Sequence, residues 1–373
     1  MERVIYNAPI TMTNQNTPDP RPSLYDLTRP QLEKALAEMG EPTFRAKQIW
    51  GWLYVRFAAE IDDMSDLSKS LREKLKEKFV LRRLTPKAQQ ESTDGWTRKW
   101  LFELPDGAEI ETVVMEYEGE RRTACISSQA GCAMDCSFCA TGQMGFMRNL
   151  RAGEIVEQVV FVSRVLAQSK ESLTNIVYMG MGEPFANFNN VMESVTRLTD
   201  PDGLNIGQRK ITISTVGLVP GMAKFAAADT QVNLAVSLHA ATDELRSRLV
   251  PINKSFALKD VAKAIREYIT KTNRRVSLEW ALIDGVNDTE AQALALVEFI
   301  RQSYDPAEEG RNMIHVNMIP LNPTGGFRGR AAHRVQAHKF SEVLTAEGIP
   351  NTIRARRGID IAAGCGQLKA ETN

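Results

Sequence analysis

Short apolar stretches alternate with longer amphipathic ones over most of the chain, and this pattern restricts the fold more than any other feature. Clusters of β-formers predict strands over 122–128, 175–180, 209–215, 232–238, 275–283, 313–319 and 352–355. Helical spacing of apolar residues predicts helices over 152–168, 190–200, 217–228, 258–271, 288–303 and 333–347. Such alternation is typical of an α/β fold with a parallel sheet. Six repeated units predict an incomplete (β/α)6 barrel over 122–350, with the active site at the carboxyl ends of its strands.

The remaining chain divides into segments of different composition. We expect a flexible leader over 1–22, a helical accessory domain over 23–90, a β extension over 91–121 and a C-terminal segment over 351–373. In the helical part, Thr28 is a candidate helix cap with Pro30 in the first turn. Basic residues interleaved with Trp50, Trp52 and Tyr54 could bind RNA by stacking, or could simply form a solvated helical cap.

Three of the five cysteines follow the first predicted strand of the barrel. Cys132, Cys136 and Cys139 have the spacing C-x-x-x-C-x-x-C, with the aromatic Phe138 in the last gap. Thiolates select iron–sulfur clusters, zinc or copper(I), and a cubane cluster held only by protein normally takes four cysteines. Three thiols would therefore leave one iron open to an outside ligand. The alternative is a structural Cys3His zinc site, with its fourth ligand among four distant histidines.

Polar residues and glycines stand at the ends of the later predicted strands. Gly182 and Glu183 follow the second strand, where glycine permits close approach of the backbone and the carboxylate could accept hydrogen bonds from a ligand ammonium. The corresponding positions on other strands are Ser214, Ser237, Leu238, His239 and Asn322. Each alone is more typical of a cap or a satisfied core residue. Around one barrel mouth, however, they predict a pocket for a nucleoside and a carboxylate.

Two further thiols lie outside the cysteine loop. Cys125 is in a predicted strand, where a lone cysteine is usually a small buried hydrophobe. Cys365 stands between Gly364 and Gly366, which predicts an open loop and an exposed, low-pKa thiolate able to act as a nucleophile.

Composition restricts location and partners. No run of about 18 apolar residues predicts a membrane span, and the N-terminus lacks a signal pattern. We therefore expect a cytoplasmic protein whose thiols are kept reduced. The formal net charge of +0 argues mildly against a nucleic-acid partner. Local basic stretches nevertheless exist at Arg82 and Arg83, at Arg328, Arg330 and Arg334, and at Arg354, Arg356 and Arg357.

The cysteine spacing resembles that of the radical S-adenosylmethionine (SAM) superfamily. Together with Gly-Glu-Pro at 182–184, Ser-Leu-His at 237–239, Pro-Leu-Asn-Pro at 320–323 and Gly-Cys-Gly-Gln-Leu at 364–368, residues 23–370 resemble the RlmN family, RNA adenine C2-methyltransferases of 23S ribosomal RNA and transfer RNA. The resemblance implies a [4Fe–4S] cluster on Cys132, Cys136 and Cys139 and two SAM molecules per turnover. It also implies SAM contacts at the strand-end residues, an electron donor such as flavodoxin, and a monomer.

The resemblance also implies a use for the other thiols. Adenine C2 is electron-poor and will not attack the methyl group of SAM, so a radical must form the bond. Cys365 would first become S-methylcysteine, and a 5′-deoxyadenosyl radical from a second SAM would remove a hydrogen from that methyl. The carbon radical would add to C2, and Glu111 resembles the acceptor of the C2 proton. Cys125 would then attack Cys365, forming a disulfide and releasing the methylated base.

Two alternatives remain open on sequence grounds. The sister activity, methylation of adenine C8 in ribosomal RNA, uses the same cysteines and the same chemistry. A protein of another class, a non-catalytic iron–sulfur or zinc protein that binds RNA, would need no reactive thiol at Cys365.

Overall fold

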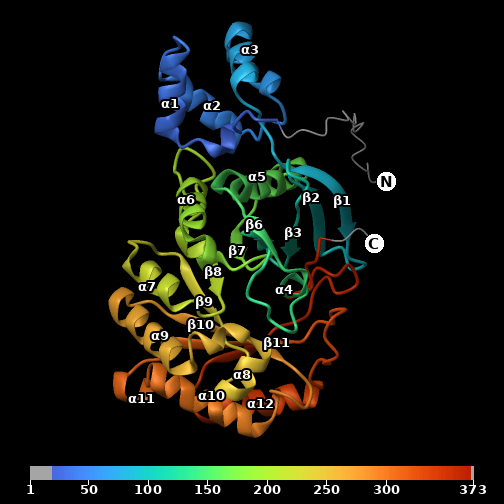
Figure 1. Ribbon diagram of the computed structural model, residues 1–373, viewed down its shortest axis with the longest axis vertical. Helices are drawn as coiled ribbons and strands as arrows, with labels where there is room; N and C mark the ends of the chain where they lie inside the picture. The colour runs from blue at the N-terminus through green and yellow to red at the C-terminus, as the bar shows by residue number, and fades with distance from the viewer. Residues whose placement is uncertain (1–18, 371–373) are drawn as a thin grey trace.

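One ten-stranded sheet runs through the molecule, in the order β1-β2-β3-β4-β7-β8-β9-β10-β11-β12. The computed structural model describes residues 19–370 (Figure 1). From β4 onward neighbouring strands are parallel, whereas β1 to β4 pair antiparallel. The parallel strands are β4 (Arg122–Cys125), β7 (Asn175–Tyr178), β8 (Ile211–Thr215), β9 (Asn233–Ser237), β10 (Val276–Leu282), β11 (Ile314–Pro320) and β12 (Asn351–Ile353). The predicted α/β fold with a largely parallel sheet is confirmed.

Helices follow the outer side of this curved sheet (Figure 1). The six predicted helices are α5 (Ala152–Gln168), α6 (Phe188–Leu198), α7 (Val219–Ala227), α9 (Leu258–Thr272), α10 (Glu290–Ser303) and α12 (Arg334–Ala346). Their apolar faces bury side chains against the strands, as their periodicity predicts. Three short helices were not predicted, namely α4 (Ala140–Met144), α8 (Asp243–Leu249) and α11 (Pro306–Glu309). They are too short to show a clear helical period.

The N-terminal helices form a separate layer at the top of Figure 1. They are α1 (Arg29–Glu38), α2 (Arg45–Tyr54) and α3 (Lys69–Lys78). Thr28 caps α1 as predicted, because its Oγ1 accepts from the backbone N–H of Gln31 at 3.4 Å. The idea that Trp50 and Tyr54 stack RNA bases is wrong, since both rings are buried and pack together, with centroids 4.5 Å apart.

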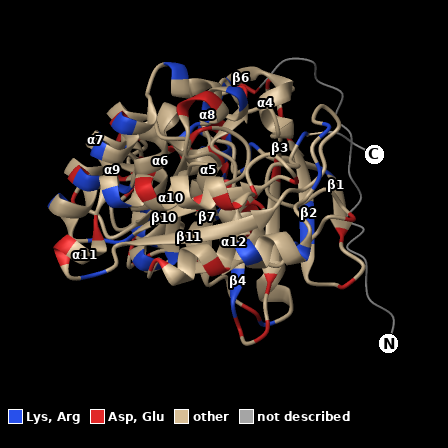
Figure 2. Ribbon diagram, turned by 90° about the horizontal axis from the view of Figure 1, so that it is seen from below, with Lys and Arg blue, Asp and Glu red and all other residues tan. Residues whose placement is uncertain are grey.

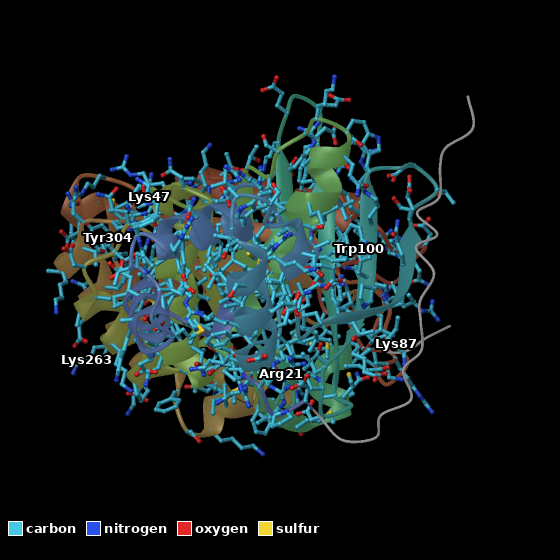
Figure 3. The ribbon with its side chains drawn as sticks, turned by 90° about the horizontal axis from the view of Figure 1, so that it is seen from above. Arg21, Lys47, Lys87, Trp100, Lys263 and Tyr304 are labelled. Atoms are coloured by element: carbon cyan, nitrogen blue, oxygen red, sulfur yellow. The ribbon has the colours of Figure 1, made fainter. Side chains whose placement is uncertain are left out.

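The β extension continues the barrel sheet. It consists of β1 (Thr85–Glu91), β2 (Thr97–Glu103) and β3 (Glu109–Glu116), and residue 90 lies within β1. Trp100 of β2 packs edge-on against Phe161 of α5, with ring centroids 5.6 Å apart, whereas Lys87 of β1 lies at the periphery (Figure 3). The extension is thus held both by backbone pairing with β4 and by a shared core with the barrel.

The expected leader lies mostly outside the described residues. Of its last residues, Pro22 accepts a hydrogen bond from the backbone N–H of Val80 at 3.0 Å, so the chain is already bound to the helical layer there. Lys, Arg, Asp and Glu are interspersed over the outer helices (Figure 2). Among residues 19–370, no helix has both the length and the apolar character needed to cross a membrane.

Candidate active site

A cavity of ≈ 160 Å³ opens at the carboxyl ends of the parallel strands. Nine of the predicted site residues line it: Cys136, Cys139, Gly182, Glu183, Ser214, Ser237, His239, Asn322 and Cys365. Four predicted residues are not part of its lining: Glu111, Cys125, Cys132 and Leu238. Strand ends far apart in sequence meet here because parallel strands end at the same edge of the sheet.

The cysteine loop is held by its own backbone and by its neighbours. It runs between β5 (Gln129–Gly131) and α4, and β6 (Phe146–Asn149) returns antiparallel to β5. The N–H of Cys132 donates to Gly145 O at 2.8 Å, and the N–H of Cys139 donates to Cys136 O at 3.0 Å. Gly131 has φ +71°, and a Cβ there would lie 2.0 Å from Gly145 O. Only glycine fits this crossing, a requirement that the sequence alone did not reveal.

Burial favours the protonated form of two thiols of the loop, those of Cys132 and Cys136. Burial raises the pKa of Cys132 to about 12 and raises that of Cys136 well above its usual value. A bound metal would displace these protons, because thiolates are the ligands. In the described part of the chain, no three His, Cys, Asp or Glu side chains converge on a site for a single metal ion. Three soft donors on one loop, two of them facing the cavity, fit a cluster with one open iron.

Glu183 lies at the end of the loop that follows β7. Its Oε1 accepts from the N–H of Phe185 at 3.0 Å and its Oε2 from the N–H of Val216 at 2.8 Å. Burial raises the pKa of this carboxyl to about 7. Gly182 has φ +98°, and a Cβ there would lie 2.5 Å from the Gln129 Cβ. This glycine therefore permits close packing against the strand before the cysteine loop, in addition to lining the cavity.

The next strand ends place neutral polar groups on the cavity wall. Ser214 Oγ and Ser237 Oγ lie 3.2 Å apart. His239 Nδ1 accepts from the N–H of Ala281 at 2.9 Å, and burial lowers the pKa of the ring to about 3, so the neutral ring carries its proton on Nε2. Leu238 differs, because its side chain is fully buried in the core.

Two buried oxygen atoms on the wall have no hydrogen-bond partner among the described residues, Asn322 Oδ1 and Glu279 Oε2. Arg354 Nη1 lies 3.8 Å from the latter. Unpaired buried acceptors are rare and indicate that a donor-bearing ligand completes the site. Sequence reasoning missed Glu279, although a charged residue within the apolar stretch Leu-Glu-Trp-Ala-Leu was a usable signal.

The C-terminal segment brings Cys365 to the same cavity and lies beside α4 (Figure 1). The N–H of Ala140 donates to Gly366 O at 2.7 Å, and Thr141 Oγ1 donates to Leu368 O at 2.6 Å. Cys365 is solvent-accessible, as predicted. The prediction of a low pKa is wrong: desolvation by the surrounding protein raises the pKa of its thiol, while the Arg354 guanidinium opposes the rise.

The other thiol outside the cysteine loop, that of Cys125, is buried at the end of β4. Burial raises its pKa, and the nearby Cys365 raises it further. The thiol of Cys365 is therefore near enough to disfavour ionisation of Cys125. Both are free thiols in this structure, as are the three cysteines of the loop.

Comparison with known proteins identifies the family. The family model described as the ribosomal RNA large subunit methyltransferase N-terminal domain (RlmN_N) matches residues 23–81, and the radical SAM superfamily model matches 126–297. A probable dual-specificity RNA methyltransferase RlmN of Chloroflexus aurantiacus is 46% identical over 350 residues, 92% of each chain. Dual-specificity RNA methyltransferase RlmN 1 of Myxococcus xanthus is 46% identical over 352 residues, 94% of this chain and 95% of that one. The chain belongs to the RlmN family.

A solved structure agrees with this assignment. The crystal structure of a radical SAM methyltransferase from Sphaerobacter thermophilus superposes with a TM-score of 0.89 at 47% identity, covering 94% of this chain and all (100%) of that one. This RlmN family member is therefore a radical SAM methyltransferase that uses SAM and a [4Fe–4S] cluster. The zinc alternative and the non-catalytic alternative are thereby set aside.

Within this RlmN family member, Glu111 is buried behind the C-terminal segment. Its Oε1 lies 2.7 Å from Lys99 Nζ, and its Oε2 accepts from the N–H of Lys369 at 2.9 Å. The carboxylate thus has a cationic partner in a buried site outside the cavity lining.

The predicted basic stretches differ in how many of their arginines already contact other groups of the protein. Arg82 pairs with Glu60, and Arg83 donates to Asp19 O at 2.8 Å and to Arg21 O, so the first stretch is engaged within the protein. Arg354 is half-buried beside Glu279, and the Arg357 guanidinium lies 4.6 Å from the ring centroid of Tyr117. The exposed arginines of the other two stretches are Arg328, Arg330, Arg334 and Arg356.

Proposed function

We propose that this enzyme forms 2-methyladenosine in 23S ribosomal RNA and transfer RNA, with Cys365 as the methyl carrier. One observation carries the proposal: the tail thiol of Cys365 lines the same cavity as Cys136 and Cys139 of the cysteine loop. A methyl group on that sulfur would therefore lie in the compartment that the cluster faces. The names of the RlmN relatives supply the RNA substrate class.

Cys132, Cys136 and Cys139 would hold the [4Fe–4S] cluster, which supplies the electron for cleavage of SAM when bound. The ionised carboxylate of Glu183 would bind the ammonium of SAM. Asn322 Oδ1, elsewhere on the cavity wall, offers a further acceptor that lacks a donor among the described residues. Further SAM contacts would come from Gly182, Ser214, Ser237 and His239. Leu238 can contribute only its backbone, because its side chain is in the core.

Cys365 begins the reaction by accepting a methyl group. Its sulfur forms a bond to the methyl carbon of SAM as the sulfonium–methyl bond breaks, which releases S-adenosylhomocysteine and requires loss of the thiol proton. The raised pKa of Cys365 disfavours the thiolate. The positive sulfonium of bound SAM would counteract this, because a nearby cation stabilises the charged form of a thiol.

Two further residues complete the proposed cycle after the methyl carbon has joined C2. Glu111 would accept the C2 proton, which requires the tail around Lys369 to move from its present contact. The adduct would also have to lose its unpaired electron to a one-electron acceptor, such as the oxidised iron–sulfur cluster. The Cys125 thiolate would attack the Cys365 sulfur, so that the S–S bond forms as the S–C bond to the RNA breaks. The electrons of that bond go to the carbon, which becomes the methyl group by protonation, and a thiol reductant then regenerates both cysteines.

RNA would approach the open side of the cavity. Arg328, Arg330, Arg334 and Arg356 are exposed and could contact phosphates, which would make binding weaker at higher salt. The target adenine would have to leave its stack to reach Cys365. The need for RNA and for reduced thiols favours the cytoplasm as the place of the reaction. A flavodoxin-type electron donor and a monomeric enzyme remain part of the proposal through the family resemblance.

The test is anaerobic reconstitution with iron and sulfide, followed by incubation with SAM, a reductant and each RNA separately. Mass spectrometry should find 2-methyladenosine in the RNA digest and one added methyl on the Cys365 peptide. In Cys125→Ala the protein–RNA adduct should accumulate, and in Cys365→Ala neither product should form. Finding 8-methyladenosine instead would refute C2 selectivity, and an unmethylated Cys365 peptide would refute the carrier role.

A further inference from the structure

Arg246, in the middle of α8, is fully buried and forms no ion pair with a carboxylate of residues 19–370. Its guanidinium donates to three neutral oxygens: Leu238 O at 3.2 Å, Asn253 Oδ1 at 2.9 Å and Val216 O at 2.6 Å. Asp243 acts on it only from a longer range, and its Oδ1 is already bonded to Asn253 and to the N–H of Leu258. Arginine keeps its charge in proteins, so the interior here holds a cation that no carboxylate of the described residues contacts directly.

The helix that carries Arg246 packs directly on the cysteine loop. Leu245 and Leu249 of α8 share an apolar cluster with Cys136 and Phe138. The C-terminal carbonyl of the helix, Leu249 O, accepts from the backbone N–H of Ser137 at 3.0 Å. Ser137 lies between Cys136 and Cys139, so α8 supports the segment that joins two of the proposed cluster ligands.

The other side of the Arg246 guanidinium faces the loops that line the SAM cavity. It binds Val216 O after β8, and the N–H of the same Val216 donates to Glu183 Oε2 at 2.8 Å. It also binds Leu238 O, directly before His239 on the cavity wall. Arg246 therefore lies behind the wall of the cavity, on the helix that supports the cysteine loop.

We propose that Arg246 is the buried counter-charge of the iron–sulfur cluster and makes its reduction easier. The inference rests on the proposed function in one respect, that Cys132, Cys136 and Cys139 hold the cluster. Three thiolates outweigh the positive charge of the oxidised core, and one-electron reduction adds a further negative charge. A fixed cation in a low-dielectric interior stabilises that reduced state. Arg246 contacts no reacting atom, so it is a positioning residue that acts through electrostatics.

The first experiment measures the midpoint potential of the reconstituted enzyme by an EPR-monitored redox titration. Arg246→Gln removes the charge, Arg246→Lys retains it, and Arg248→Gln makes the same change at an exposed position of the same helix, where the side chain is 68% accessible. We expect Arg246→Gln to lower the ratio of reduced to oxidised cluster at a fixed solution potential about tenfold, a negative shift of about 59 mV for one electron. Arg246→Lys and Arg248→Gln should remain near the wild-type potential.

A second measurement distinguishes an electrostatic role of Arg246 from a merely structural role. The thermal midpoint of unfolding is recorded for each protein with and without its cluster. If Arg246 compensates the cluster, cluster binding should raise the midpoint more in the wild type than in Arg246→Gln. A residue that only ties three loops together would lower both midpoints equally and leave the increment unchanged.

Each outcome of these two measurements either supports or overturns the role of Arg246 as the counter-charge. An unchanged potential in Arg246→Gln, or equal increments in midpoint, would overturn the inference. If Arg246→Gln fails to take up iron while Arg246→Lys binds a cluster of wild-type potential, the role of charge is supported. If both variants fail and the wild type succeeds, guanidinium geometry holds the loop and the inference is wrong. Failure of the wild type itself to bind a cluster would instead refute the proposed function, and this inference with it.

Discussion

The side-chain amide of Asn322 donates a hydrogen bond to the backbone carbonyl oxygen of Cys365, with nitrogen and oxygen 3.0 Å apart. Asn322 follows β11 at the barrel mouth, and Cys365 lies in the C-terminal segment. The backbone bond from Ala140 to Gly366 fixes the same segment to the cysteine loop. The tail that carries Cys365 is therefore anchored on two sides of the cavity.

Removal of the Asn322 amide should loosen this tail. One hydrogen bond of this kind contributes about 0.5–1.5 kcal/mol, so Asn322→Ala should raise the population of the open tail about two- to tenfold. The measurement is the rate of alkylation of Cys365 in the metal-free protein, followed by mass spectrometry of its peptide. Asn312→Ala is the matched control, because Asn312 makes a similar bond to Gly348 O away from the cavity. Equal alkylation rates in both variants and the wild type would contradict the prediction.

Gly180 should not tolerate a side chain. A Cβ there would lie 2.7 Å from the carbonyl carbon and oxygen of Ile126, which are backbone atoms and cannot rotate away. Gly180→Ala should therefore cost about 1–3 kcal/mol in the free energy of unfolding, and should weaken SAM binding because Gly180 lines the cavity. Gly207→Ala is the control, since its nearest atom would be Lys210 Cγ at 4.0 Å. Urea denaturation and calorimetric SAM titration test both effects, and an unaltered denaturation midpoint in Gly180→Ala would refute the clash.

The Lys99–Glu111 ion pair should be much stronger than an exposed one. The side chains are 8% and 2% accessible, so Lys99→Met would leave a buried carboxylate without its cation and cost about 3–5 kcal/mol. Lys87→Met breaks a pair whose side chains are 43% and 39% accessible, and should cost about 1 kcal/mol or less. Adding Glu111→Leu to Lys99→Met should recover part of the loss. Urea denaturation at neutral pH gives these energies, and similar costs for Lys99→Met and Lys87→Met would contradict the argument.

Glu157 should make stability fall as pH rises. Burial raises the pKa of this α5 carboxyl from 4.5 to about 8, although it accepts from the backbone N–H groups of Arg83 and Leu84. Between these two pH values the folded state binds more protons than the unfolded state, so the free energy of unfolding decreases with rising pH. In the isosteric variant Glu157→Gln this contribution is absent, while one acceptor oxygen remains for both N–H groups.

The measurement is urea denaturation of wild type and Glu157→Gln at four pH values from 5 to 8. The stability of Glu157→Gln relative to the wild type should increase steadily over this range. Glu342→Gln, at an exposed position of α12, serves as the control and should run parallel to the wild type. If the free energy of unfolding of Glu157→Gln also ran parallel to that of the wild type over this pH range, the raised pKa of Glu157 would be refuted.

Local patterns were sufficient to predict most of the framework. The six long helices and seven parallel strands appear near their predicted positions, because their apolar periodicity reflects burial along one face. The short helix α8 was not predicted, although it supports the cysteine loop and carries Arg246. Its seven residues are too few for a periodic signal, and a buried arginine cannot be told from an exposed one by its letter.

The sequence by itself determined the donor set of the cysteine loop, the order of strands and helices, and the family resemblance, because each depends on residue type and spacing along a short stretch. Only the tertiary structure decided which groups share the cavity, since that depends on where distant strands end. Folding brought Glu279 to the cavity wall, placed Glu111 against Lys99 outside it, and raised rather than lowered the pKa of Cys365. Burial and charge neighbours govern these properties, and both arise only when segments far apart in sequence pack together.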